Sequence, residues 1–236
     1  MSNRTEGETR MRYARVAGSV YLLLIVLFMG GPFLAGHIAG DGSFAERTVN
    51  ISGGLPLYRI ALVLQLLASV FTVVLAYSLY MVVKCADEAT ARLALYFRLG
   101  EAFGGLTAFV TFAALALRTD PKFAQALGPG QVQALVDLAG TADFASFNIG
   151  IVFFSFGSTL FYRVFLRTPY LPRALSAFGM FASALTFVVA VTGLVMPQWG
   201  NAVQVGWLPI FVAEIATGIW LLARGARLAP AVAVAA

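Results

Sequence analysis

The sequence has almost none of the side chains that form disulfides and soft-metal sites. It contains one cysteine, Cys85, and one histidine, His37. A single cysteine forms no internal disulfide, and zinc, iron–sulfur and most haem sites need several Cys or His ligands. The sequence also has no phosphate-binding glycine loop, no Gly-x-Ser-x-Gly elbow and no helix with paired His ligands. No cofactor is therefore expected, and the common hydrolase and nucleotide-enzyme classes are unsupported.

Charged residues are also scarce. They make up 11% of the 236 residues, against about 25% in ordinary soluble domains, whereas 60% of the residues are hydrophobic. A soluble fold of this length needs a charged surface to cover its core. Most of the Lys and Arg residues lie at the ends of apolar runs and form no basic face, which argues against a nucleic-acid partner. The chain is therefore expected to lie in a membrane, with lipid around it.

Six apolar segments are each long enough to cross a bilayer, since a helix needs about 20 residues to span roughly 30 Å of hydrocarbon. The predicted spans are residues 16–36, 57–83, 93–117, 144–166, 174–195 and 205–223. Most prolines lie at or beyond the ends of these segments, where a missing N–H is tolerated. The expected fold class is all-α, a polytopic membrane protein with a bundle of six transmembrane helices.

The distribution of basic residues predicts the orientation. With the N-terminus inside, eleven Lys and Arg residues flank the cytoplasmic helix ends and four flank the outer ends. This positive-inside bias places both termini in the cytoplasm. The expected organisation is a cytoplasmic tail over residues 1–15, a transmembrane domain over 16–224 and a cytoplasmic tail over 225–236. The expected location is the inner (plasma) membrane, as a multi-pass protein.

Two outer loops and one proline need separate predictions. Residues 37–56 are rich in Gly and Ser and are expected to form a loop. Residues 130–143 contain apolar side chains at helical spacing, which predicts a separate short helix at the membrane interface, with Asp143 as a candidate cap of the next span. Pro209 is expected to be tolerated near the start of the last helix, and a kink near Glu214 is the alternative.

Ionisable groups at depth are the candidates for chemistry, because a charge in hydrocarbon is costly without a partner or a water-filled cavity. Arg98 and Glu101 lie three residues apart in the third span, and Glu214 is isolated in the sixth. At 1.5 Å per residue both glutamates lie about 15 Å from the cytoplasmic helix ends. Two interpretations stay open. Arg98 forms an ion pair that locks the third and sixth helices together, or the carboxylates share it and one of them holds a transferable proton.

Polar side chains on the other helices could face the same interior. Gln65 lies on the second span and Asn148, Ser155 and Tyr162 lie on the fourth, each group along one helical face. With twenty phenylalanines and eight tyrosines in the chain, they would suit a pocket for a lipophilic ligand with one polar end. Hydrogen bonding between helices is the competing interpretation of such polar stripes.

Several phrases along the chain together resemble a known family. They are RVAGSVYLLLIV, LYRIALVLQLL, LYFRLGEA, GIVFFSFGSTLFYRVFLRTPYLPRALSAFG and AEIATGIWLLARG. Their order and spacing resemble the bacterial integral membrane family called domain of unknown function 4386, over nearly the whole chain. The resemblance implies a six-helix bacterial membrane protein and places Arg98 and Glu214 in recurrent phrases. It implies no established activity.

The leading functional hypothesis is a bundle that holds a lipophilic small molecule against Glu214, Glu101 and Arg98. The protein would either bind this molecule or transform it by acid–base catalysis, with Glu214 as the acid, Arg98 orienting it and Glu101 as its partner. An isoprenoid-like or lipid substrate would suit such a site, because aromatic faces stabilise developing cations. The alternatives are a non-catalytic accessory or scaffold subunit with no assigned protein partner, and a small proton-coupled transporter.

Overall fold

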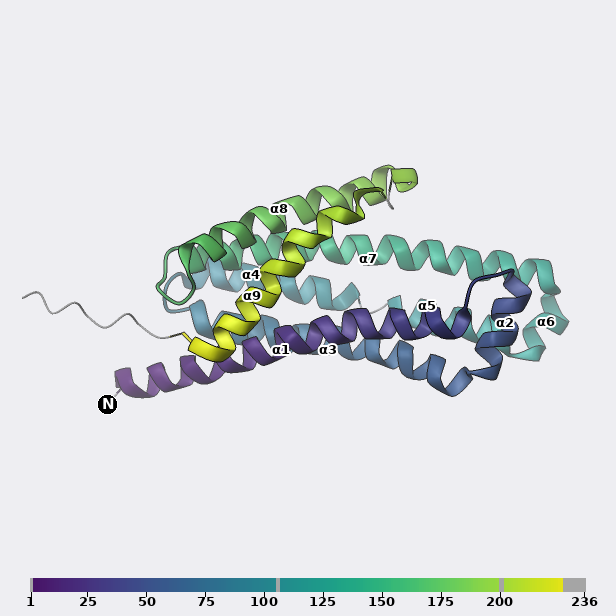
Figure 1. Ribbon diagram of the computed structural model, residues 1–236, viewed down its shortest axis with the longest axis horizontal. Coiled ribbons are helices and arrows are strands. Elements are labelled where there is room, and N and C mark those ends of the chain that lie inside the picture. Colours follow the sequence, from purple (N-terminus) through teal and green to yellow (C-terminus); the bar gives the residue numbers. More distant parts are fainter. Residues whose placement is uncertain (1, 105–106, 200–201, 227–236) are drawn as a thin grey trace, which may run out of the picture.

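The computed structural model describes residues 2–104, 107–199 and 202–226, and within these ranges the chain is helical with no strand (Figure 1). The predicted C-terminal tail therefore lies outside the described residues from position 227 onward. The helices are α1 (Ser2–Ala39), α2 (Phe44–Gly53), α3 (Leu55–Val83), α4 (Glu88–Phe103), α5 (Thr107–Thr119), α6 (Pro121–Leu127), α7 (Pro129–Leu166), α8 (Arg173–Val195) and α9 (Leu208–Arg224). Two short 3-10 helices, Pro197–Trp199 and Ala202–Trp207, precede α9.

Six helical stretches are long and apolar enough to cross a membrane, which confirms the predicted fold class. Helices α1, α3, α7 and α8 each provide one stretch, and α9 with the end of the preceding 3-10 helix provides the sixth. The third stretch consists of α4 and α5, which lie on either side of residues 105–106. Many large apolar side chains point outward, among them Val26, Phe33 and Val70 at 66%, 78% and 53% exposure. Lipid would cover these side chains.

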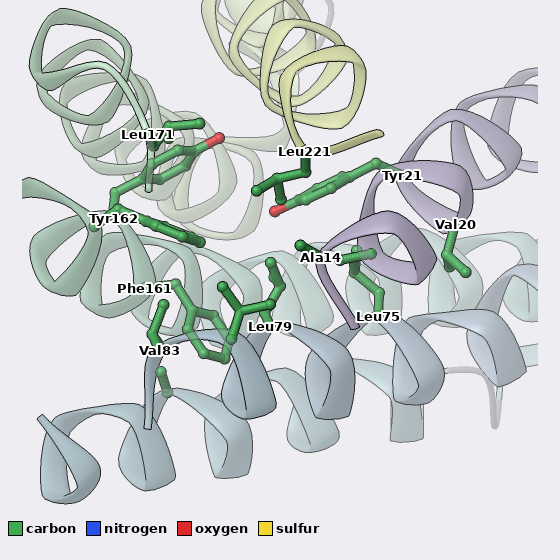
Figure 2. Packing of buried hydrophobic residues seen from close by; sticks show 14 of the residues in the cluster. Ala14, Val20, Tyr21, Leu75, Leu79, Val83, Phe161, Tyr162, Leu171 and Leu221 are labelled. Carbon is green, nitrogen blue, oxygen red and sulfur yellow. The ribbon is translucent and has the colours of Figure 1, made fainter. Parts of the chain in front are cut away.

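The helices pack tightly at the end of the bundle where both described chain ends lie, called here the terminal end (Figure 1). There α1 packs on α3 and α9, and α7 packs on α4 and α8. Figure 2 shows the core at this end, in which Tyr21 of α1 and Leu221 of α9 face Leu79 of α3 and Phe161 of α7. Helices α2 and α6 lie at the opposite end, called the far end.

The contact between α1 and α9 depends on close approach of two backbones. A Cβ atom on Gly18 would lie 2.5 Å from the backbone nitrogen of Leu222 and 2.6 Å from the carbonyl oxygen of Gly218. Neither backbone atom can move away without shifting α9. Small residues at such positions let membrane helices gain van der Waals contact where no hydrophobic force drives them together.

At the far end a helix forms where a loop was predicted, because a capping box stabilises the helix in a segment whose Gly and Ser content favours a loop. Residues 37–56 include helix α2, whose capping box joins Ser43 and Glu46. The backbone N–H of Ser43 donates to Glu46 Oε2 at 2.8 Å, as does the Ser43 hydroxyl, and these bonds lower the pKa of the Glu46 carboxyl below its usual value. The loop expected here is therefore wrong over Phe44–Gly53.

Two further expectations are corrected. The short helix at 130–143 is not separate but forms the first part of α7, so Asp143 lies inside that helix and caps nothing. Pro129 at the start of α7 supplies the boundary that the apolar pattern alone placed later. Helix α1 also continues through Pro32 to Ala39. Pro209 lies in the first turn of α9, as expected for a tolerated proline.

We predict that Gly18→Ala lowers the thermal unfolding midpoint of the purified protein in detergent. The added methyl group meets backbone atoms, and overpacking of this kind costs about 1–3 kcal/mol. Gly30→Ala is the matched control on the same helix, because no atom lies within 4 Å of its Cβ position. The control should leave the midpoint unchanged or raise it, since alanine favours helix by about 1 kcal/mol over glycine. Equal midpoints for the two variants would contradict this account of the contact.

Candidate functional site

A cavity of about 700 Å³ lies among the helices of the bundle. Residues of α1, α3, α4, α5, α7 and α9 line it, so every predicted span except the fifth contributes. Arg98, Glu101 and Glu214 line its deep end, and Tyr58, Arg118 and Asp143 line the part toward the far end. Each of the three predicted catalytic side chains therefore borders one space.

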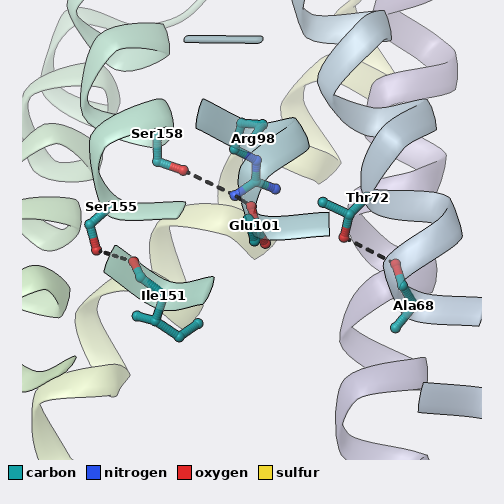
Figure 3. Close-up of polar contacts among 7 residues, drawn as sticks. All are labelled: Ala68, Thr72, Arg98, Glu101, Ile151, Ser155 and Ser158. Carbon is teal, nitrogen blue, oxygen red and sulfur yellow. Dashed lines mark hydrogen bonds and ion pairs between the residues drawn. The ribbon is translucent and has the colours of Figure 1, made fainter. Parts of the chain in front are cut away.

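Arg98 is held at the deep end by partners on two helices. Its side chain is only 2% exposed, and Nη1 lies 3.0 Å from Glu101 Oε2 on the next turn of α4. The same Nη1 donates to the hydroxyl of Ser158 on α7 at 3.3 Å (Figure 3). The guanidinium carbon also lies 4.6 Å from the ring centroid of Phe154, a cation–π contact.

Gly157 leaves the room that the arginine occupies. A Cβ atom there would lie 2.8 Å from Arg98 Cγ and 3.1 Å from the carbonyl oxygen of Ala94. Helices α4 and α7 therefore approach closely enough for Ser158 to reach the guanidinium. The position of the Arg98 charge therefore depends on the close packing of α4 on α7.

The hydrogen-bonding capacity of this ion pair is incompletely used. Nε of Arg98 and Oε2 of Glu101 are buried, and neither has a hydrogen-bond partner among the described residues. Although Oε2 lies close to the guanidinium, the geometry between them is that of a charge contact and not of a hydrogen bond. Because both residues line the cavity, a molecule inside it could supply the missing partners.

Glu214 lines the cavity from α9 and has no hydrogen bond or ion pair with any described residue. Its carboxylate interacts electrostatically with Arg98 and with Tyr162 without direct contact. Helix α4 packs on α3 and α7, whereas α9 packs on α1 and α8. The predicted ion pair locking the third and sixth spans together is therefore wrong, because the partners of Arg98 lie on α4 and α7.

The four predicted ligand-binding residues divide into two groups. Gln65 lines the cavity, together with Ser69 and Thr72 on the same helix. Asn148, Ser155 and Tyr162 are buried but do not line it. Asn148 Nδ2 donates to the Phe144 carbonyl at 2.9 Å, Ser155 Oγ donates to the Ile151 carbonyl at 2.8 Å, and the Tyr162 and Thr217 hydroxyls lie 3.0 Å apart. Only the Tyr162–Thr217 contact joins two helices, α7 and α9, as the competing interpretation expected, whereas Asn148 and Ser155 bond to carbonyls of their own helix.

The sequence pattern did not identify the cavity residues nearer the far end. Arg118, one of the four basic residues at the outer helix ends, lines the cavity, lies 4.3 Å from the Phe44 ring centroid and donates to Thr48 Oγ1 at 3.4 Å. Asp143 lines the cavity from the middle of α7. Ser43 and Glu46, spaced as a capping box, were the signal for the start of α2, the helix that Arg118 contacts. No described group of three or more His, Cys, Asp or Glu side chains could hold a metal ion.

A family model covers most of the chain and includes all three deep residues. The model described as "Domain of unknown function (DUF4386)" matches residues 16–225. The chain belongs to this family. No curated protein and no solved structure matches the chain. In this DUF4386 member the matched region extends from α1 to the end of α9 and contains the whole cavity.

We predict that Arg98→Met lowers the unfolding midpoint, because it leaves the buried Glu101 carboxylate without its cation. Breaking one side of a buried pair costs roughly 3 kcal/mol or more, whereas replacing both partners by apolar residues is often tolerated. The double variant Arg98→Met/Glu101→Leu should therefore recover most of the lost stability. Thermal unfolding in one detergent measures all three proteins. A double variant less stable than the single variant would show that the pair contributes more than mutual neutralisation.

Proposed function

We propose that this DUF4386 protein holds a lipophilic small molecule in the central cavity, with the polar end of the molecule against Arg98, Glu101 and Glu214. The observation that supports the proposal is that one cavity connects these buried groups with apolar walls. Its volume of about 700 Å³ falls within the range of roughly 300–1,000 Å³ that small-molecule sites occupy. Among the described residues, the buried side-chain atoms without a hydrogen-bond partner are Arg98 Nε and Glu101 Oε2, and both residues lie at its deep end.

The walls suit a lipophilic body. Aromatic side chains from four helices and from the segment before α9 border the cavity, and aliphatic side chains fill the space between them. The aromatic side chains are Phe28, Tyr58, Phe147, Phe154, Phe211 and Trp207. Pockets of this kind bind apolar ligands by burying their surface, while a few polar groups fix the ligand's orientation.

The expected orientation would place the cavity in the outer half of the membrane. Both described chain ends lie at the end opposite α2 and α6 (Figure 1), and the positive-inside bias assigns that end to the cytoplasm. In the inner (plasma) membrane the ligand would then enter from the outer leaflet or from outside the cell. This arrangement suits a lipophilic molecule that partitions into the bilayer before it binds.

A second candidate function is proton transfer to the bound molecule. Glu214 has no partner among the described residues, so its carboxyl group is free to give or take a proton at the ligand's polar end. Arg98 would orient that end, and Glu101 would balance its charge. A purely structural role for the three residues is less well supported, since Glu214 is not used to join helices. Proton-coupled transport would use the same residues and would appear as ligand movement without chemical change.

We predict that Ser69→Phe abolishes binding of the neutral fluorescent lipophile N-phenyl-1-naphthylamine to the protein in lipid nanodiscs. The larger side chain would fill part of the cavity that Ser69 lines. Val70→Phe is the matched control, because Val70 is the next residue, is 53% exposed and does not line the cavity. Equal fluorescence increases for wild type and both variants would show that the probe binds elsewhere and would contradict the proposal.

We further predict that Glu214→Gln preserves folding and binding of the neutral probe but stops chemical conversion of the natural ligand. Glutamine keeps the size of the side chain and removes its transferable proton. Mass spectrometry of lipophilic molecules that copurify with each protein checks this, because the variant should retain the substrate and the wild type the product. Identical copurifying molecules would rule out catalysis and leave binding or transport as the function.

A further inference from the structure

The charges that line the cavity do not balance. Among the described lining residues five are charged, namely Arg98, Arg118, Glu101, Asp143 and Glu214. Two of these are positive and three are negative, which leaves one carboxylate in excess. Arg98 is already paired with Glu101, and Arg118 contacts α2 through Phe44 and Thr48.

The excess lies at the deep end. There Glu101 and Glu214 face one guanidinium, whose ion pair is with Glu101. Asp143 lies farther out, seven residues or about 10 Å along α7 from Gly150, which packs against the backbone of Glu101. A single uncompensated carboxylate among apolar walls is costly, so Glu214 must hold either a proton or a cation.

The surroundings of Glu214 contain no second cation among the described residues. The charged and titratable groups around it are Arg98 and Glu101 on α4, Tyr21 on α1 and Tyr162 on α7. Helix α3 adds the neutral Gln65, Ser69 and Thr72 to the lining. Tyrosine and amide side chains carry no positive charge, so without a bound cation Glu214 is neutralised by a proton.

The cavity walls favour an organic cation over a metal ion. No described group of three or more acidic, His or Cys side chains gathers as metal coordination needs. Phe211 and Trp207 instead line the space with aromatic rings. Ring faces attract quaternary or protonated nitrogen by about 0.5–2 kcal/mol each where water is excluded.

We propose, on the basis of the function proposed above, that the ligand is a lipophilic organic cation with a protonated amine or quaternary ammonium group that binds at Glu214. Binding exchanges one positive charge for another. The O–H bond of the Glu214 carboxyl breaks, its proton leaves to solvent, and the ammonium group pairs with the resulting carboxylate. The charge of the cavity is therefore the same before and after binding.

The exchange fixes the pH dependence of binding. Since the complex contains one proton fewer than the empty protein, raising the pH strengthens binding of a permanent cation. Below the pKa of Glu214 in the empty cavity the affinity should rise about tenfold per pH unit, and above it the affinity should become constant. A neutral ligand of the same shape should show no such dependence.

The experiment compares phenyltrimethylammonium with tert-butylbenzene, which has the same shape without the charge. Each displaces N-phenyl-1-naphthylamine from the protein in nanodiscs, and nanodiscs with Ser69→Phe protein give the background. At pH 8 we expect the cation to bind at least tenfold more tightly than tert-butylbenzene. This preference should be lost progressively on acidification. Calorimetry in buffers of different ionisation enthalpy should find about one proton released per cation bound below the pKa of Glu214, where the affinity rises with pH, and none above it.

Glu214→Gln should remove the preference for the cation while retaining the neutral probe, and Glu214→Asp should keep the preference. If the glutamine variant does not fold, the aspartate variant and the pH dependence of the wild type still test the proposal. Failure of wild type to bind the neutral probe would overturn the proposed function itself. Normal probe binding with equal affinity for cation and tert-butylbenzene, or a preference that survives in Glu214→Gln, would overturn only the assignment of a cationic ligand.

Discussion

The buried ion pair between Arg98 and Glu101 determines the arrangement of the middle of the bundle. A guanidinium at this depth is tolerated only with a carboxylate and further polar contacts, and it obtains them from its own helix and from Ser158 on α7. Gly157 lets α7 approach, and Phe154 covers the guanidinium. The position of α4 on α7 follows from this contact, and so does the direction in which the remaining polar atoms face.

The bundle combines a closely packed half with a hollow half. At the terminal end Gly18 and Gly218 bring the backbones of α1 and α9 together, and the large core side chains fill the space beside them. Helix α9 has only 17 residues and crosses the bundle obliquely, so it does not follow α1 to the far end (Figure 1). A small separate cluster that includes Ile51 of α2 and Leu115 of α5 packs there instead. The cavity occupies the space between these two apolar contacts.

Hydropathy and length predicted the six spans because the bilayer imposes both. The same signals could not predict α2, since its stability rests on the bonds between Ser43 and Glu46 in a polar sequence. Helical spacing brought Arg98 and Glu101 together, and isolation in an apolar run singled out Glu214. Periodicity could not separate Gln65, which lines the cavity, from Asn148 and Ser155, whose side chains bond to carbonyls of their own helix. Both kinds of residue lie on a buried face, and only the relative rotation of the helices distinguishes them.

The distribution of unused polar capacity favours a ligand over a scaffold. If the three charged residues served packing alone, Glu214 could approach Arg98 directly, pair with its free Nε and join α9 to α4. Instead Arg98 Nε and Glu101 Oε2 have no hydrogen-bond partner among the described residues, and Glu214 borders the same space without pairing with Arg98. Buried polar groups without hydrogen bonds destabilise a bundle in which they serve packing alone. Their convergence on one apolar cavity is understandable if a bound molecule completes their interactions.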